Sequence, residues 1–168
     1  ELSETHSLSL GAQHGCAVVH RNVGEHGERQ VRCWGRNDAA QLGTADAPQT
    51  CGGVACRPTA VAVALGWQPA QVEAGARHTC ARLQEGHVWC WGDGQQGQLG
   101  RRLPEGTTEG APAVLDVAAV AGARHLGVGA HHGCVVTSDG SLWCWGRNDL
   151  GQAAGSDAVA WQPVVLFD

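Results

Sequence analysis

The side chains of this 168-residue chain that could do chemistry are mainly its eight cysteines and nine histidines. Three of the cysteines follow a histidine by two residues, and each has another cysteine 10 to 17 residues further on. Cysteines spaced in this way can form disulfides or, together with the histidine, bind a metal ion. A closed structural zinc site needs four ligands. Each group offers three, for example His78, Cys80 and Cys90, so disulfides are favoured and metal binding is the alternative.

Catalytic motifs are missing from the sequence. It contains neither a Gly-x-Ser-x-Gly elbow nor a His-Glu-x-x-His zinc motif. All 11 basic residues are arginine, and the lack of lysine excludes a Walker-type phosphate loop and Schiff-base chemistry. The aspartates at 38, 93, 139 and 149 fall in turns, where this residue is favoured for conformational reasons. We therefore expect no enzyme activity and no cofactor.

Charge and hydropathy narrow the range of partners. The formal net charge is −5 and no basic cluster is present, which argues against nucleic acid, because phosphate contacts need concentrated Lys and Arg. No apolar run approaches the roughly 20 residues of a membrane helix. The first residues lack the basic stretch and apolar core of a signal peptide, as expected of a processed chain or of a cloned fragment.

Internal repeats organise the chain. The pattern Gly-Ala-x-His-x-Cys occurs at Gly11–Cys16, Gly75–Cys80 and Gly129–Cys134, and each copy is followed by Cys-Trp-Gly and a turn-rich segment. Short segments punctuated by glycine indicate strands rather than helices. Units of about 50 residues built from such strands are typical of propellers. We expect an all-β fold of about three tandem four-stranded antiparallel blades in a single domain, 1–168. The repeats would span about 8–43, 58–100 and 112–155, with a closing strand at 163–168.

The combined motif resembles the regulator of chromosome condensation repeat. It consists of Gly-x-x-His-x-Cys, then Asp-Gly or Glu-Gly, then Cys-Trp-Gly-x-Asn-x-x-Gly-Gln-Leu-Gly. The paired cysteines are similar to those of the bacterial extracytoplasmic branch of that family. The resemblance implies a β-propeller, and propellers usually close with about 4–8 blades. Two copies depart mildly from the motif: Ala40 replaces a turn glycine, and Ala153-Ala154-Gly155 replaces Leu-Gly.

Hairpin register tests the cysteine pairing. If Cys80 lies opposite Cys90, a three-residue loop ending in Gly86 remains, and Cys134 opposite Cys144 leaves a loop ending in Gly140. Three-residue hairpin loops favour glycine at that last position. Opposed residues of antiparallel strands are about 4.5–5.5 Å apart, within the range that a disulfide accepts. The four expected disulfides are Cys16–Cys33, Cys51–Cys56, Cys80–Cys90 and Cys134–Cys144.

Histidine and tryptophan recur in register, which indicates structural roles. We expect His14, His78 and His132 to be buried or half-buried and to hydrogen-bond the backbone. Trp34, Trp91 and Trp145 alternate with the cysteines, so they face the other side of their strands, and we expect them to pack between blades.

Disulfides persist in oxidising compartments, so we expect an extracytoplasmic location: secreted, periplasmic or on the cell surface. The resemblance implies two non-catalytic roles, because the founding member of the family is an exchange factor for a small GTPase and a secreted bacterial relative inhibits β-lactamases. We expect a protein-interaction or structural module, with an exchange-factor or enzyme-inhibitor propeller as the alternative. A metal-binding or hydrolytic propeller is the further alternative.

Three segments depart most from the repeat and are either contact loops or simple surface insertions: His20–Gln30, Thr44–Arg57 and Arg101–Gly110. The expected partner is another protein or further copies of the chain. In the second case we expect a homo-oligomer in which two chains meet head to tail, each lending its strand at 163–168 to the other's first blade.

Overall fold

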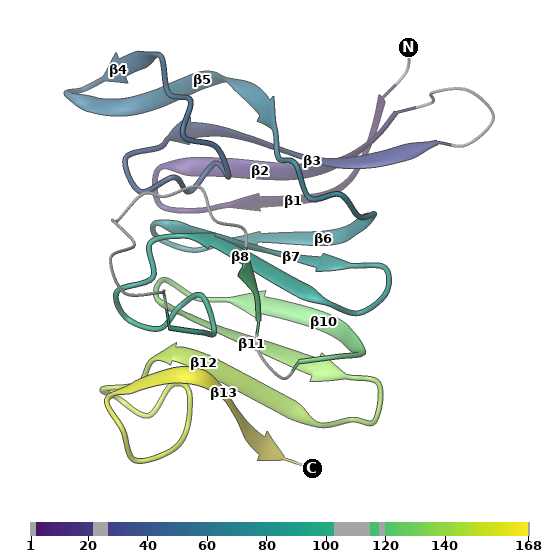
Figure 1. Ribbon diagram of the computed structural model, residues 1–168, viewed down its shortest axis with the longest axis vertical. Coiled ribbons are helices and arrows are strands. Elements are labelled where there is room, and N and C mark those ends of the chain that lie inside the picture. The colour runs from purple at the N-terminus through teal and green to yellow at the C-terminus, as the bar shows by residue number, and fades with distance from the viewer. Residues whose placement is uncertain (1–2, 22–26, 103–114, 118–119, 168) are drawn as a thin grey trace.

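The computed structural model describes residues 3–21, 27–102, 115–117 and 120–167. These residues form three antiparallel sheets that follow one another along the chain, as expected for propeller blades (Figure 1). Blade 1 contains β1 (Ser3–Leu10), β2 (His14–Arg21), β3 (Glu28–Arg36), β4 (Gln49–Cys51) and β5 (Val54–Ala62). Blade 2 contains β6 (Pro69–Ala74), β7 (His78–Leu83), β8 (Val88–Gly92) and β9 (Leu115–Asp116). Blade 3 contains β10 (Ala123–Val128), β11 (His132–Thr137), β12 (Leu142–Arg147) and β13 (Val159–Phe167).

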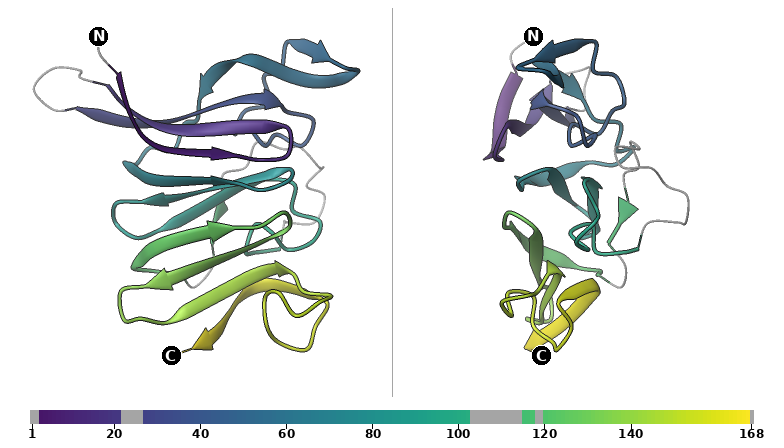
Figure 2. Two further views of the ribbon diagram at one scale, coloured as in Figure 1. Left: turned by 180° about the vertical axis from the view of Figure 1, so that it is seen from behind. Right: turned by 90° about the vertical axis from the view of Figure 1, so that its left-hand side faces the viewer.

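The strands of blades 2 and 3 pair in chain order, from β6 to β9 and from β10 to β13, and the strands of blade 1 have the order β1-β2-β3-β5-β4. The first strands of the three blades lie along the same side of the stack (Figure 2, right). Blade 1 differs from the expected four strands, because β4 pairs with β5 and adds a fifth strand at the outer edge. The segment that carries this extra strand is Thr44–Arg57.

Segments that begin with proline and continue with valine (Pro-Val segments) recur in the sequence at 58–63, 112–117 and 163–168. The described residues of these segments end a blade instead of beginning one. We expected residues 163–168 to complete the first blade of a ring. In the structure, β13 pairs with β12 of its own blade, with Val164 opposite Cys144 and Val165 opposite Trp143. Likewise β5 pairs with β3, with Val61 opposite Cys33. The repeat gives the period of these segments but not the side on which each one pairs.

The central hairpins have the register expected from the cysteines. Cys16 lies opposite Cys33, Cys80 opposite Cys90 and Cys134 opposite Cys144. In blade 2 the amide of Leu83 donates to the carbonyl of His87, so alternation along the ladder places Cys80 and Cys90 at a non-hydrogen-bonded pair. Side chains approach closely at such pairs, and the three blade disulfides join Cα atoms 4.1 Å apart. The fourth disulfide, Cys51–Cys56, joins β4 to β5.

The core lies between the blades. Trp91 of blade 2 packs against blade 1 beside Leu42 and Val63, and Trp145 of blade 3 packs against blade 2 beside Leu99 and Val117. Both indoles are fully buried, and their Nε1–H groups donate to the carbonyls of Gln41 and Gln98 in the preceding blade, each at 3.0 Å. Their expected role in packing between blades is confirmed. No helix among the described residues is long and apolar enough to cross a membrane.

Candidate binding surface

The repeated histidines lie over the glycines of their own motif. An added Cβ at Gly11, Gly75 or Gly129 would lie 2.6 Å or less from Cε1 of His14, His78 or His132, respectively. The spacing Gly-x-x-His is therefore a packing requirement. We expected His14 to hydrogen-bond the backbone. Instead, its Nε2 lies 2.8 Å from the hydroxyl oxygen of the Thr79 side chain. Within the described chain, the ring nitrogens of buried His78 have no hydrogen-bond partner.

Side chains also tie the first strands of neighbouring blades together. Ser9 on β1 accepts a hydrogen bond from the amide of Ala74 on β6 at 3.0 Å. One blade further on, Gln71 on β6 binds both backbone groups of Leu126 on β10, donating at 2.7 Å and accepting at 3.2 Å. These bonds fix the position of each blade on the next, so the surface that the blades share is held rigidly.

Two arginines and an aspartate meet at one end of blades 1 and 2: Arg36 ends β3, Asp38 lies in the turn that follows it, and Arg77 lies in the turn between β6 and β7. Asp38 is bound by Arg36 and, across the blade boundary, by Arg77 at 3.2 Å. The hydrogen bond from Arg36 is the main reason that the pKa of Asp38 falls to about 2. Asp38 is therefore held in its charged form between two guanidinium groups.

The connection from blade 1 to blade 2 instead presents a large apolar side chain to solvent. Trp67 is 57% exposed, whereas Trp91 and Trp145 are fully buried. The connection is anchored on both sides of Trp67. The amide of Val63 donates to Val31, and Gln68 accepts hydrogen bonds from the amides of Arg29 and Gln84. Gly66 adopts a left-handed φ of 69°, which turns the chain immediately before the tryptophan. Trp67 is therefore an exposed side chain on a preorganised backbone.

Two hollows flank Trp67, and both are lined by Trp67 and Glu85. The larger, about 330 Å³, extends along residues 28–31 of β3 and residues 63–69 of the connection. The smaller, about 200 Å³, is completed by Leu83, His87 and Trp89. We call these two hollows and Trp67 the Trp67 surface. An aromatic side chain between concave, partly polar hollows is typical of protein-binding surfaces, where Trp is enriched among the anchoring residues.

The connection between blades 2 and 3 provides an internal comparison. It repeats the same anchors, because the amide of Val117 donates to Val88 and the carbonyl of Gly122 accepts from Ser138. Gly122 therefore corresponds to Gln68, and the residue before it, the exposed Ala121, corresponds to Trp67. The scaffold of the repeat therefore does not require a tryptophan at this position.

Comparisons with known proteins agree with the blade architecture. Residues 70–98 and 117–152 match the family model of the regulator of chromosome condensation (RCC1) repeat. The ultraviolet-B receptor UVR8 of Arabidopsis thaliana is 31% identical over 167 residues, which cover 96% of this chain and 34% of the receptor. The chain belongs to the RCC1-repeat β-propellers.

Solved RCC1-like structures superimpose closely. Human WBSCR16 has a TM-score of 0.80 at 20% identity, over 97% of this chain and 41% of that one. Yeast RCC1 (Prp20), in a structure bound to Kap60, has a TM-score of 0.76 at 23% identity, over 98% of this chain and 35% of that one. The chain thus spans 34–41% of the length of these relatives.

The three segments that we expected to be contact loops or surface insertions differ in their contacts and in how much of each the structure describes. Thr44–Arg57 is wholly described and is locked onto itself by Cys51–Cys56 and by an ion pair of Arg57 with Asp46. Of His20–Gln30, residues 20–21 and 27–30 are described, and Arg29 lines the larger hollow. Of Arg101–Gly110, residues 103–110 lie outside the described residues, and the guanidinium of Arg102 lies 5.0 Å from the ring centre of Trp161.

Sequence reasoning did not single out Trp67 as a surface residue. It is part of Trp67-Gln68-Pro69, which recurs as Trp161-Gln162-Pro163, and this similarity obscured its place between two blades. Trp67 lies outside every Cys-Trp-Gly motif, and this position could have indicated that it does not pack between blades as the motif tryptophans do. The alternative metal site also finds no support, because Cys80 and Cys90 are joined in a disulfide and have no free thiolate to offer.

Proposed function

We propose that this chain is an extracytoplasmic protein-binding module that contacts its partner through the Trp67 surface. The observation that carries the proposal is the 57% exposure of Trp67 between two hollows, on a connection whose counterpart in the next blade carries alanine. Burying an indole of this size removes a large apolar area from water, which is why tryptophan dominates many interfaces.

The cysteines support the extracytoplasmic part of the proposal. All eight are engaged in disulfides within a blade. Reducing cytosol would open such bonds, whereas secreted proteins keep them. Yeast RCC1, which this chain resembles in fold, has been solved in a complex with another protein, Kap60.

An affinity experiment tests the binding role. The disulfide-intact chain is immobilised and exposed to envelope and secreted fractions of the native organism, beside the variants Trp67→Ala and Phe167→Ala. Phe167 is a matched control because it is 68% exposed but lies on β13 of blade 3. The proposal expects a protein that binds the unmodified chain and the Phe167 variant and is lost with Trp67→Ala. Equal capture by all three would reject the Trp67 surface. Turnover of a small molecule by the pure protein, abolished by a point substitution, would reject a non-catalytic module.

We further propose that a second copy of the chain packs on the free face of blade 1. Leu8 of β1 is 60% exposed, although its counterparts Val72 and Leu126 are 0% and 5% exposed because each packs on the preceding blade. Trp34 is likewise half-buried where Trp91 and Trp145 are fully buried. This face of blade 1 therefore has the apolar side chains with which the other blades dock.

A further inference from the structure

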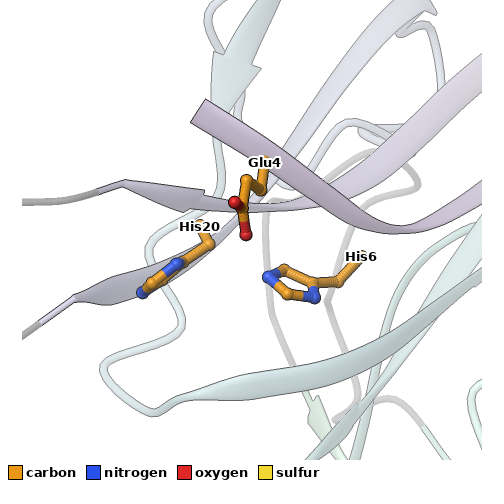
Figure 3. Close-up of side chains that lie close together, drawn as sticks. All are labelled: Glu4, His6 and His20. Atoms are coloured by element: carbon orange, nitrogen blue, oxygen red, sulfur yellow. The ribbon is translucent and has the colours of Figure 1, made fainter. Parts of the chain in front are cut away.

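We propose that Glu4, His6 and His20 form a binding site for a divalent transition-metal ion such as Zn²⁺. One ligand atom of each residue lies within 4.8 Å of the others. Figure 3 shows the Glu4 carboxylate pointing into the space between the two imidazoles, whose ring centres are 5.7 Å apart.

Strand register explains why these three side chains meet. Glu4 on β1 lies directly opposite His20 on β2, and opposed residues of a ladder project from the same face. The register then shifts between Thr5 and Ser7, so His6 is the extra residue of a β-bulge. A bulge re-aims the side chain that it carries. Here it brings the His6 imidazole beside the Glu4–His20 pair.

The same bulge recurs in the other blades without metal ligands. The register shifts between Pro69 and Gln71 in blade 2 and between Ala123 and His125 in blade 3. The residues inside these bulges are Ala70 and Arg124, neither of which has a side chain that commonly binds metals. The bulge therefore belongs to the scaffold, and the ligand set belongs to blade 1 alone among the described blades.

The donor set suits a borderline metal ion. Imidazole nitrogens and a carboxylate oxygen together bind Zn²⁺ in sites that keep a further position open. Ligand atoms around a tetrahedral ion lie about 3.4 Å apart, given metal–ligand bonds of about 2.1 Å. Glu4 and His6 are exposed and His20 is half-buried, so rotation of side chains closes the remaining distance without moving the core.

The site adjoins the Trp67 surface through the β2–β3 hairpin. His20 lies opposite Arg29, and Arg29 lines the larger hollow. An ion held by three protein ligands has a vacant position that a carboxylate or imidazole of another molecule can take. The metal would also clamp the end of β1 to β2.

Direct titration tests the site on the full chain, prepared without a polyhistidine tag and stripped with a chelator. Co²⁺ serves as the first probe, because its visible absorption reports the ligands and geometry, and Zn²⁺ is then used to displace it. We expect one equivalent to bind. Affinity should fall at least about tenfold in His6→Ala and in His20→Ala, and measurably in Glu4→Gln. His125→Ala is the matched control, because His125 is an exposed histidine next to the bulge of blade 3.

The outcomes separate the site from incidental binding. Binding that persists in His125→Ala and is lost in both the His6 and His20 variants supports the proposal. Absence of stoichiometric binding, or equal loss in the control, overturns it. Far-ultraviolet circular dichroism of each variant shows that the blades are intact. The test is independent of the proposed protein partner, since capture through Trp67 can fail while Co²⁺ still binds.

Discussion

Nε2 of His14 lies 2.8 Å from Oγ1 of Thr79, across the boundary between blades 1 and 2. The Thr79 hydroxyl donates its proton to the carbonyl of Gln41, also at 2.8 Å. The hydroxyl oxygen must then accept from the imidazole, which places the proton of neutral His14 on Nε2. Both side chains are buried, so a single hydroxyl connects the histidine of one blade with the turn that receives Trp91.

Removal of that hydroxyl should weaken the contact between blades. Thr79→Val keeps the shape of the side chain but leaves the Nε2–H of His14 and the Gln41 carbonyl with one partner fewer. We expect the free energy of unfolding, measured by urea denaturation, to fall by about 1–3 kcal/mol. Thr79→Ser retains the hydroxyl and should lose less. An unchanged midpoint for the valine variant would show that the hydroxyl does not couple the blades.

Acid should destabilise the fold well before the carboxylates titrate. Burial lowers the pKa of His14 to about 4 and the pKa of His78 to about 3. An unfolded chain protonates its histidines below about pH 6.5, whereas the folded chain keeps these two neutral. Stability is therefore complete above pH 6.5 and falls by about 1.4 kcal/mol per pH unit for each histidine, down to pH 4 for His14 and pH 3 for His78.

Urea titrations between pH 7.5 and 4.5 measure this dependence. In His14→Asn, the free energy of unfolding should depend less steeply on pH between pH 6 and pH 5, and the difference in slope should equal the contribution of one histidine. Stability that does not change over this range would contradict neutral, buried imidazoles in the folded chain.

Parts of this structure follow from local sequence and parts do not. The hairpin register was predictable because Gly86 and the pairs Cys80–Cys90 and Cys134–Cys144 are close in sequence and constrain one another. The blade boundary was not, because a Pro-Val segment can pair with a strand on either side without changing the repeat. The Glu4–His6–His20 cluster depends on a bulge that leaves no mark in the residue pattern.

Disulfide bonding is measurable directly. A digest analysed by mass spectrometry without reduction should contain the four pairs and no free thiol. Replacing Cys134 and Cys144 together by alanine should lower the free energy of unfolding by about 2–3 kcal/mol, since the bond closes a short loop. Free thiols in protein isolated from its own cells would indicate a reducing compartment and would contradict the extracytoplasmic proposal.

One alanine occupies a backbone conformation suited to glycine. Ala154 has a φ of 56° where Gly100 of blade 2 has a φ of 68°. A left-handed conformation costs a residue with a Cβ about 1 kcal/mol or more. Ala154→Gly should therefore stabilise the protein by about 0.5–1 kcal/mol in thermal or urea unfolding. Ala40 also has a positive φ, but Ala40→Gly should gain less because that methyl group is buried. Destabilisation by Ala154→Gly would contradict this account.

The free face of blade 1 should drive self-association. Sedimentation velocity of the unmodified chain should show a species larger than 17.5 kDa. Leu8→Glu should shift it to the monomer, because a charge would be buried unpaired in the contact. Ala121→Glu introduces the same charge on the exposed second connection and should leave the assembly intact. A monomer in every case would reject the second copy as the occupant of this face.

Every disulfide of this protein lies inside a blade, and the described blades adhere to one another by noncovalent contacts: packing, hydrogen bonds and the ion pair of Arg77 with Asp38. Covalent bonds thus preserve the register of the central hairpin of each blade even when the blades separate. A partly denatured molecule that stays oxidised keeps its hairpins in the native register, so refolding requires only that the hairpins dock again. After reduction, the strands must also find their native pairing.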